Sequence, residues 1–463
     1  GGKSRRLPAY APLGKVLMPL PVCRWAVGQH LDQRLLDLQT DFYDQVSLNA
    51  RPEHVAMVCS GDVLMLTNDN IPNLPKADVV CLGIWVSADE AQRFGVFFSP
   101  RRAPNKLAFT LQKPHPRKTH QLSRDYYFLV DIGVWLLSSR AVNTIMQKSQ
   151  CLDSSKKVSK NAVPDFYDLY TDFGLTLGTE PVQYDAETSE LSTAVIPLRN
   201  AEFYHFGTSY DLVNSTYRLQ NRVLDQQRIS TSPVKPHPDV FKQNAAVKVQ
   251  LNDQNREMWI ENAEIPDTWK LNSRHIITGI PHNNWQIELP ENLCLDIIPV
   301  DDQHLCLRPY HITDTFRGPL NKPETQWLGI SARQWFKDRN LTLKKAGLNP
   351  EDDLQDAPLF PVLKAGSLSQ ELIEWMIFPK QAESGTDTAN LWLQSERLSA
   401  ETIAQRINPE RLSLQRHNHL KQVLPSLAAN HRHSVFYKLD LEHTADLYNK
   451  YNTKSPPWVS GRL

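Results

Sequence analysis

The chain has 463 residues and a formal net charge of zero, with 51 basic and 51 acidic side chains. A zero net charge supplies no global field for nucleic acid or an anionic membrane, so phosphate recognition must come from local clusters. Hydrophobic residues make up 41% of the chain and charged residues 22%, which is typical of folded proteins with sizeable cores.

The sequence shows no sign of a membrane span, a signal peptide or a disulfide framework. No apolar run approaches the roughly 20 residues that cross a bilayer. Six cysteines are scattered without a Cys-x-x-Cys pair, which favours reduced thiols in a cytoplasmic protein over a disulfide scaffold or a zinc site. The chain opens on a motif and not on Met, so we expect its natural start to lie upstream.

Residues 1–230 show alternating helical and strand-like segments. Apolar residues from Leu31 to Val46 recur with helical periodicity, and short apolar runs follow. This alternation favours an α/β fold with a mainly parallel, wound sheet. The predicted strands are His54–Cys59, Ala77–Trp85, Gly95–Phe98, Leu107–Leu111 and Phe128–Leu137.

The character of the sequence changes over residues 231–330. Short apolar runs separated by turns predict an all-β module, a β-helix or roll, although the spacing is too irregular to count repeats. Three tryptophans of this region fit a β core better than a carbohydrate platform; they are Trp259, Trp269 and Trp285.

Residues 331–463 read as a mixed and helical segment. Helical character runs from Leu393 to Leu427, with Ser399 as a capping residue, and another short helix is predicted from Ser434 to Asn449. Asp387–Asn390 and Ser455–Pro457 are predicted to be loops.

Five basic residues precede Asp32, the first acidic residue of the chain. Adjacent glycines at Gly1 and Gly2 let backbone N–H groups approach an anion, and arginine and lysine side chains offer donors to phosphate oxygens. The segment is not a Walker P-loop, because Val16 follows Lys15 where that motif needs Ser or Thr. On composition alone it fits either an anion-binding loop or a solvated basic arm.

The spacing from Gly1 to Pro8, followed by Gly14-Lys15, resembles the signature of the sugar-nucleotide nucleotidyltransferases. With Tyr10-Ala11-Pro12 the segment is most similar to the GDP-fucose pyrophosphorylase domain of bifunctional L-fucokinase/GDP-fucose pyrophosphorylases. The resemblance runs along essentially the whole chain, including Trp259–Asn262 and Ile276–Gly279.

This resemblance implies a Rossmann-like (GT-A-like) nucleotidyltransferase domain over residues 1–230 and a β-helix-like module over residues 231–330. Residues 331–463 would form a helical C-terminal segment that leads toward a kinase domain in bifunctional relatives. A kinase of that type carries its own glycine-rich phosphate loop, and no such loop follows residue 230, so fucokinase activity is not expected here.

The resemblance also implies roles for individual residues. Arg6 and Lys15 would stabilise the triphosphate and the departing pyrophosphate, and Lys113 would hold the sugar phosphate. Lys113 follows Gln112, where many relatives carry Glu, and without the resemblance a surface lysine before a turn is an equal alternative. The remaining predicted nucleotide-binding residues are Gly1, Gly2, Ser4, Arg5 and Gly61.

The resemblance implies that Asp62 is a Mg²⁺ ligand, and its place fits, because Ser60-Gly61-Asp62 ends a predicted strand where α/β sheets bind ligands. His205 stands where the family has a second metal-binding aspartate, so the metal assignment rests on Asp62 alone. A turn aspartate is the structural alternative for Asp62.

Sugar-phosphate binding is the role implied for a further set of residues. Asp131 interrupts an apolar run, and the structural alternative there is a bulge at Gly133 with a salt-bridged aspartate. The acidic pair in Tyr167–Phe173 is expected to be structural. The predicted sugar-phosphate-binding residues are Asp131, Gly133, His205, Gly207 and Thr208.

The expected reaction joins GTP and β-L-fucose 1-phosphate to give GDP-L-fucose and pyrophosphate, with Mg²⁺ as cofactor and with neither nucleic acid nor membrane as partner. Two alternatives stay open from the residues: a catalytically silent sugar-nucleotide-binding module, and a pyrophosphorylase for another hexose 1-phosphate. Guanine selection cannot be read from any motif.

Overall fold

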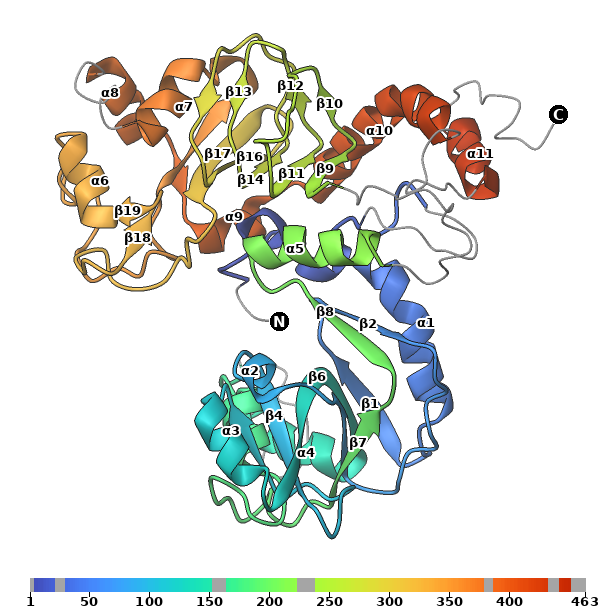
Figure 1. The fold of residues 1–463 in the computed structure, drawn as a ribbon. Helices are drawn as coiled ribbons and strands as arrows, with labels where there is room; N and C mark the ends of the chain where they lie inside the picture. Colours follow the sequence, from blue (N-terminus) through green and yellow to red (C-terminus); the bar gives the residue numbers. More distant parts are fainter. Residues whose placement is uncertain are drawn as a thin grey trace. The chain divides into compact units, whose positions relative to one another are not determined.

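The computed structural model describes residues 4–20, 30–151, 164–222, 238–378, 386–431 and 441–450 (Figure 1). The chain forms two compact units: Leu36–Tyr204, called here the α/β unit, and the residues up to Leu35 together with those from His205 on, called the β-solenoid unit. The predicted domain boundary at residue 230 lies outside the described residues, and the one at residue 330 falls within strand β19 (Ile330–Ser331). None of the described helices is both long and apolar enough to cross a membrane.

The α/β unit alternates helices and strands, as predicted. The apolar runs expected to be strands are strands, and the predicted helix is α1. The elements are α1 (Leu35–Leu48), β1 (His54–Cys59), β2 (Val63–Thr67), β3 (Val79–Ile84), α2 (Ala88–Ala91), β4 (Gly95–Pro100), β5 (Phe109–Gln112), α3 (Pro116–Leu122), β6 (Tyr126–Ser138), α4 (Ser139–Lys148), the helical turns Leu169–Phe173 and Gly174–Thr176, β7 (Thr193–Leu198) and β8 (Ala201–His205).

A six-stranded mixed sheet forms the centre of this unit, in the order β5-β4-β6-β3-β7, with β1 paired to β6. Strands β3 and β7 are parallel, whereas β1, β3 and β4 are antiparallel to β6, and β5 is antiparallel to β4. The prediction of a mainly parallel sheet is therefore wrong for the described strands. The sheet is covered on both faces, so its antiparallel strands carry the continuous apolar runs that usually mark parallel ones.

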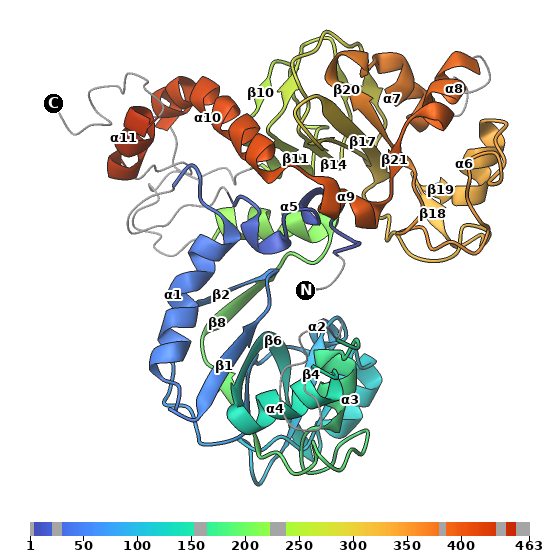
Figure 2. The same ribbon diagram turned by 180° about the vertical axis from the view of Figure 1, so that it is seen from behind.

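Two apolar clusters cover the two faces of the sheet. Val80 and Leu82 of β3 point to one cluster, where Phe42 and Val46 of α1 also lie. Cys81, between them, points to the second cluster. This second cluster includes Ala141 of α4, and α4 is seen against the sheet in Figure 2. Successive side chains of a strand alternate between faces, so both faces are buried.

Strands β1 and β4 lie on the same side of β6 and pair with different halves of it. Strand β4 pairs with Tyr126–Val130, and β1 pairs with Val134–Ser138. Strand β3 occupies the other side. Residues 131–133 of β6 therefore face a gap between the end of β1 and the start of β4. Open α/β sheets bind ligands at such interruptions of strand order.

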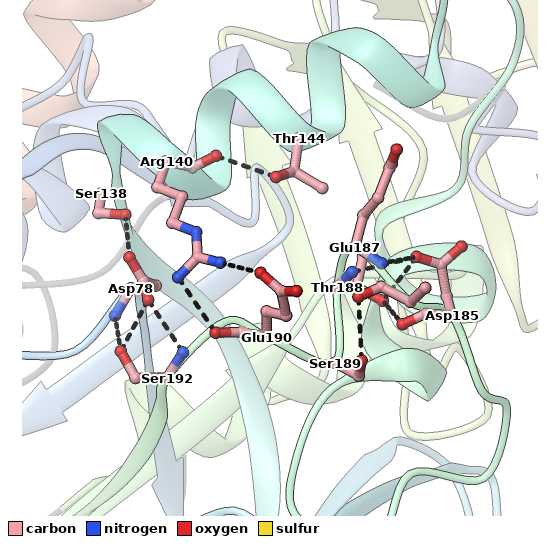
Figure 3. Close-up of polar contacts among 11 residues, drawn as sticks. Asp78, Ser138, Arg140, Thr144, Asp185, Glu187, Thr188, Ser189, Glu190 and Ser192 are labelled. Carbon is pink, nitrogen blue, oxygen red and sulfur yellow. Dashed lines mark hydrogen bonds and ion pairs between the residues drawn. The ribbon is translucent and has the colours of Figure 1, made fainter.

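A polar network joins the end of β6 to the starts of β3 and β7 (Figure 3). The carboxylate of Asp78 accepts hydrogen bonds from Ser138 Oγ at 2.8 Å, from Ser192 N at 2.9 Å and from Ser192 Oγ at 2.8 Å. Nearby, Arg140 Nη2 lies 2.6 Å from Glu190 Oε2. These contacts join the start of α4 to the segment that leads into β7.

The β-solenoid unit contains parallel strands stacked in coils. Val240 pairs with Met258, and Met258 with His275, so successive coils are offset by 18 and 17 residues. The predicted all-β module is confirmed, and its coiled, β-helix-like form is present. The strands are β9 (Val240–Gln243), β10 (Ala246–Val247), β11 (Met258–Glu261), β12 (Glu264–Ile265), β13 (Lys270–Leu271), β14 (His275–Thr278), β15 (Glu288–Leu289) and β16 (Leu293–Pro299).

The longest sheet of this unit continues beyond the coils, in the order β21-β20-β17-β16-β14-β11-β9. Trp259 and Trp269 are buried, as the core assignment predicts, and Trp285 is half-buried. The remaining strands are β17 (His304–His311), β18 (Gln326–Trp327), β19, β20 (Phe360–Lys364) and β21 (Arg397–Leu398).

Helices complete the unit, and the first turns of α10 lie at the carboxyl ends of the parallel strands, where Arg416 pairs with Glu261 of β11 (Figures 1 and 2). The Ser399 side chain caps α9, as predicted, by accepting from Thr402 N. The loop prediction for Asp387–Asn390 is wrong, because these residues begin α8, whose Trp392 is fully buried against Trp335. Ser455–Pro457 lie outside the described residues. The helices are α5 (Ser209–Gln220), α6 (Ala332–Asp338), α7 (Gln370–Ile377), α8 (Thr386–Gln394), α9 (Ala400–Arg406), α10 (Pro409–His431) and α11 (Leu441–Lys450).

Candidate active site

Asp62 stands just beyond the end of β1, as predicted from the sequence. Helix α1 holds the turn before it, because Gln39 Nε2 and Tyr43 Oη donate to the carbonyl of Ser60 over 3.3 and 3.2 Å. Ser60 Oγ in turn donates to Asp62 Oδ1 over 2.8 Å. The Asp62 carboxylate is thus oriented within the turn and half-buried.

Gly133 brings β6 against this turn. Ser60 N donates to the carbonyl of Gly133 over 2.7 Å. The Gly133 backbone has a φ of +71°, and a Cβ added there would lie 2.5 Å from Ser60 Cβ. Only glycine permits this approach without displacement. The bulge proposed for Gly133 is consistent with the break in β3–β6 register between Cys81 and Gly83.

Asp131 is a buried carboxyl group, 7% exposed. Gly133 N donates to its Oδ1 over 2.7 Å, and Trp135 Nε1 lies 3.1 Å from both carboxylate oxygens. Burial raises the pKa of Asp131 to about 7, against the lowering effect of these hydrogen bonds. No ion pair to Asp131 is found among the described residues, so the salt bridge of the structural alternative is absent there.

Tyr170 is a site residue that the sequence did not single out. Its ring meets Trp135 edge to face, with centroids 6.1 Å apart. Burial, followed by the charges of Asp131 and Asp62, raises the pKa of the Tyr170 hydroxyl. The two carboxylates therefore share this tyrosine as a neighbour. No spacing pattern marks it; an aromatic residue in an acidic stretch was the only signal.

The acidic pair around Tyr170 is structural, as expected. Asp168 caps the helical turn Leu169–Phe173 by accepting from Tyr170 N and Thr171 N over 2.8 Å. Asp172 Oδ2 accepts from Asp168 N over 2.8 Å. Both carboxylates thus hold the turn that carries Tyr170.

Lys113 follows directly after β5 and is exposed, with a φ of +50°. Its strand neighbour Gln112 pairs with Gly95, the first residue of β4. A Cβ added at Gly95 would lie 3.0 Å from Gln112 Nε2 and 3.5 Å from Asp131 Cβ. Lys113 is therefore close in the sheet to the same gap as Asp62, Asp131 and Gly133. Its contact with a sugar phosphate stays a prediction.

In the β-solenoid unit, residues 4–15, called here the basic segment, lie along the start of α5. Ser209 N donates to the carbonyl of Arg6 over 2.8 Å. Lys15 Nζ donates to the carbonyl of Gly207 over 3.0 Å. Arg6 is exposed, and Ser4 adopts a positive φ of 50°. Gly1 and Gly2, which were predicted to bind nucleotide, lie outside the described residues.

Arg5 makes an ion pair at the other side of the segment. Its Nη1 lies 3.0 Å from Asp353 Oδ1 and donates to the carbonyl of Phe316 over 3.2 Å. The described contacts of Arg5 thus fix its side chain to the β-solenoid unit. Nucleotide binding by Arg5 stays a prediction.

His205, Gly207 and Thr208 form the turn before α5. Thr208 caps the helix in a reciprocal capping box with Asp211, and His205 Nδ1 lies 3.3 Å from Asp211 Oδ2. Burial would raise the pKa of Asp211, but the contacts with His205 and Thr208 lower it overall. A Cβ on Gly207 would lie 2.0 Å from His205 Cε1, so a side chain at this position would have to displace the His205 ring.

The described residues contain no group of three or more His, Cys, Asp or Glu side chains arranged to hold a metal ion. Mg²⁺ usually binds through one or two carboxylates plus substrate phosphates and water. Asp62, a half-buried carboxylate at a sheet edge, fits that pattern of ligation. His205 Nδ1 lies beside Asp211, and the assignment of the metal to Asp62 alone stays a prediction.

Two solved structures resemble parts of the chain only weakly. A mannose-1-phosphate geranyltransferase from Thermus thermophilus is 11% identical, covers 51% of this chain and 57% of its own, and gives a TM-score of 0.26. A UDP-glucose pyrophosphorylase from Acinetobacter baumanii is 12% identical, covers 37% and 53%, and gives a TM-score of 0.22. These scores are too low to indicate a shared fold across the chain.

Sequence comparisons are much stronger. The family model described as the fucose pyrophosphorylase domain matches residues 1–365. The chain is 42% identical over 456 residues to the L-fucokinase/L-fucose-1-P guanylyltransferase of Bacteroides fragilis, a match that covers 98% of this chain and 47% of that relative. The chain thus spans about half the length of this curated relative. The predicted resemblance is confirmed, and the chain belongs to the fucose pyrophosphorylase family.

Proposed function

We propose that this chain is a fucose-1-phosphate guanylyltransferase, which forms GDP-L-fucose and pyrophosphate from GTP and β-L-fucose 1-phosphate. In a chain of this family, the observation that carries the proposal is the packing of the basic segment against the start of α5. There Lys15 and the Arg6 backbone are fixed by Gly207 and Ser209, while the Arg6 side chain stays exposed.

In the proposed reaction an oxygen of the sugar phosphate attacks the α-phosphorus of GTP. A new P–O bond forms, and the bond to the departing pyrophosphate breaks. The nucleophile is already anionic, so no general base is needed, and the rate depends on positioning and charge neutralisation. Arg6 and Lys15 would neutralise the triphosphate and pyrophosphate, and Lys113 would orient the sugar phosphate.

Asp62 would hold Mg²⁺, which would supply charge neutralisation at the phosphate oxygens when bound. Asp131 would accept a hydrogen bond from a sugar hydroxyl or donate one to it, because a carboxyl group with a pKa of about 7 can do either near neutral pH. Gly133 would leave room for the ring. Gly207 would offer its backbone N–H and Thr208 its hydroxyl to a phosphate, with His205 beside them, since the Thr208 N–H donates to Asp211 Oδ2. A cytoplasmic location stays a prediction from the scattered cysteines.

The test is pyrophosphate release by this chain with a panel of nucleoside triphosphates and hexose 1-phosphates. The proposal expects release that requires both partners and is fastest for GTP with fucose 1-phosphate. Faster release with another hexose 1-phosphate would move the assignment to a different pyrophosphorylase. Binding of GTP without pyrophosphate release, whichever nucleoside triphosphate and hexose 1-phosphate are combined, would identify a catalytically silent binding module.

A further inference from the structure

The basic segment is held in place by a buried ion pair of the solenoid. Arg308 Nη2 donates to the carbonyl of Pro8 over 2.8 Å. The same nitrogen lies 2.8 Å from Asp296 Oδ2, and the two side chains are 1% and 0% exposed. Thr278 Oγ1 donates to the other carboxylate oxygen over 2.8 Å. A buried charge pair needs such additional hydrogen bonds to be tolerated, so the geometry at Pro8 is tightly specified.

Tyr10 makes a second anchor two residues further on. Its hydroxyl donates to the carboxylate of Glu261 and accepts from Trp259 Nε1, which is 2.7 Å away. Arg416 of α10 pairs with the same glutamate. Tyr10 is 3% exposed, and its ring meets Trp259 edge to face. The hydroxyl is therefore a fixed point in a buried polar network.

Arg5 makes the third anchor, through Asp353. Leu7, between the anchors, is fully buried. Arg5, Pro8 and Tyr10 are thus tied to separate stretches of the unit, whereas Arg6 between them is exposed. The side chain that is expected to meet the nucleotide, that of Arg6, thus lies between residues that are fixed to the rest of the unit.

We propose that Tyr10, Glu261, Arg308 and Asp353 are positioning residues of the nucleotide site. The β-solenoid would then help to form this site. The proposal rests on the proposed function, because it assumes that the segment binds the nucleoside triphosphate. Charged donors stabilise a transferring phosphate best when they are held in place before the reaction. Loss of an anchor should weaken nucleotide binding and leave the sugar phosphate unaffected.

The test compares Tyr10→Phe with Tyr448→Phe in the 463-residue chain. Tyr448 is also fully buried and donates to the Leu424 carbonyl over 2.8 Å, but it lies on α11. Both variants lose a buried hydroxyl, so both should lower the melting temperature. Only Tyr10→Phe should raise the KM for GTP, by about fivefold, the equivalent of one lost hydrogen bond. Its KM for fucose 1-phosphate should be unchanged.

An equal KM for GTP in parent and Tyr10→Phe would overturn the proposal, and so would equal increases in the two variants. Should Tyr10→Phe fail to fold, Asp353→Asn replaces it, since this partly exposed carboxylate holds Arg5. If the parent shows no turnover, the proposed function fails, and the same comparison is made with the dissociation constant for GTP. A parent that neither turns over nor binds GTP overturns both ideas.

Discussion

The ammonium group of Lys15 donates to the backbone carbonyl of Gly207, 3.0 Å away and 192 residues later in the chain. One partner belongs to the basic segment and the other to the turn before α5, two motifs that the sequence placed in one site only by resemblance. The contact holds the lysine through a group that carries no net charge. A positive charge fixed in place is what stabilisation of a leaving pyrophosphate requires.

Replacing Lys15 with alanine should remove that charge from the reaction. We expect kcat/KM for GDP-fucose formation to fall by roughly a hundredfold to a thousandfold, as for loss of one preorganised donor. The matched control is Lys364→Ala, an exposed lysine at the end of β20. A folded Lys15→Ala chain with a rate within about threefold of the parent would remove the assigned role.

Replacing Asp62 with asparagine should raise the Mg²⁺ concentration needed for half-maximal turnover, because a neutral amide is a weaker ligand for a hard cation. The measurement is a Mg²⁺ titration at saturating substrates. Asp89→Asn, an exposed aspartate in the first turn of α2, serves as the control. Identical Mg²⁺ dependence in the Asp62 variant and the parent would rule out the metal role.

Asp131 should make stability depend on pH. Burial raises its pKa from 3.8 to about 7, so between these values the folded state keeps a proton that the unfolded state releases. The contribution of Asp131 to the free energy of unfolding should therefore fall with rising pH through this window, by roughly 4 kcal/mol, and level off above it.

Urea unfolding of the parent and of Asp131→Asn at several pH values checks this prediction. The variant cannot titrate at residue 131, so the parent's stability relative to it should decline from about pH 4 to about pH 7. Asp314, whose pKa is also raised to about 7, is present in both chains and cancels in the difference. A difference that is constant across the window would contradict the burial argument.

Gly133→Ala should perturb the gap in the sheet, and Gly347→Ala is a matched control. Both glycines have a φ of +71°, but an added Cβ meets Ser60 Cβ at 2.5 Å in the first case and nothing within 4 Å in the second. Both variants should lose about 1–2 kcal/mol for the left-handed backbone. Only Gly133→Ala should lose more than this and also lower turnover; equal losses in thermal unfolding would show the prediction to be wrong.

Periodicity and burial made much of the α/β unit predictable. All six residues of β3 are buried, so Ala77–Trp85 stood out as an apolar run. The same property concealed the direction of the strands. A strand buried on both faces has a continuous apolar sequence, whether it is parallel or antiparallel to its neighbours. Pairing is set by contacts between distant segments, which a local pattern does not contain.

The solenoid was predictable as β structure but not as a regular repeat. Met258 is aligned with His275 in neighbouring coils, and Thr278 with Asp296. Met258 and His275 thus share full burial without sharing residue type. His275 fits because its Nδ1 pairs with the Leu293 carbonyl at 2.7 Å and because burial lowers its pKa to about 4, which favours the neutral ring.

The candidate site was predictable only in part. The place of Asp62 after a strand and the cost of burying Asp131 marked these two carboxylates, but their roles as metal and sugar ligands came from the family resemblance. Tyr170 carried no such signal, since its relation to Asp131 and Trp135 arises from packing of a helical turn against the sheet. The anchoring of Pro8 by Arg308 links residues 300 positions apart and could not be read from either segment.

The most direct test of the account is the product balance of a single reaction. The chain is incubated with GTP, fucose 1-phosphate and Mg²⁺, and GDP-fucose and pyrophosphate are quantified together, with Lys15→Ala in parallel. The account predicts equal amounts of the two products from the parent and far less of both from the variant. Release of inorganic phosphate and GDP instead, or no product from a chain that binds GTP, would contradict it.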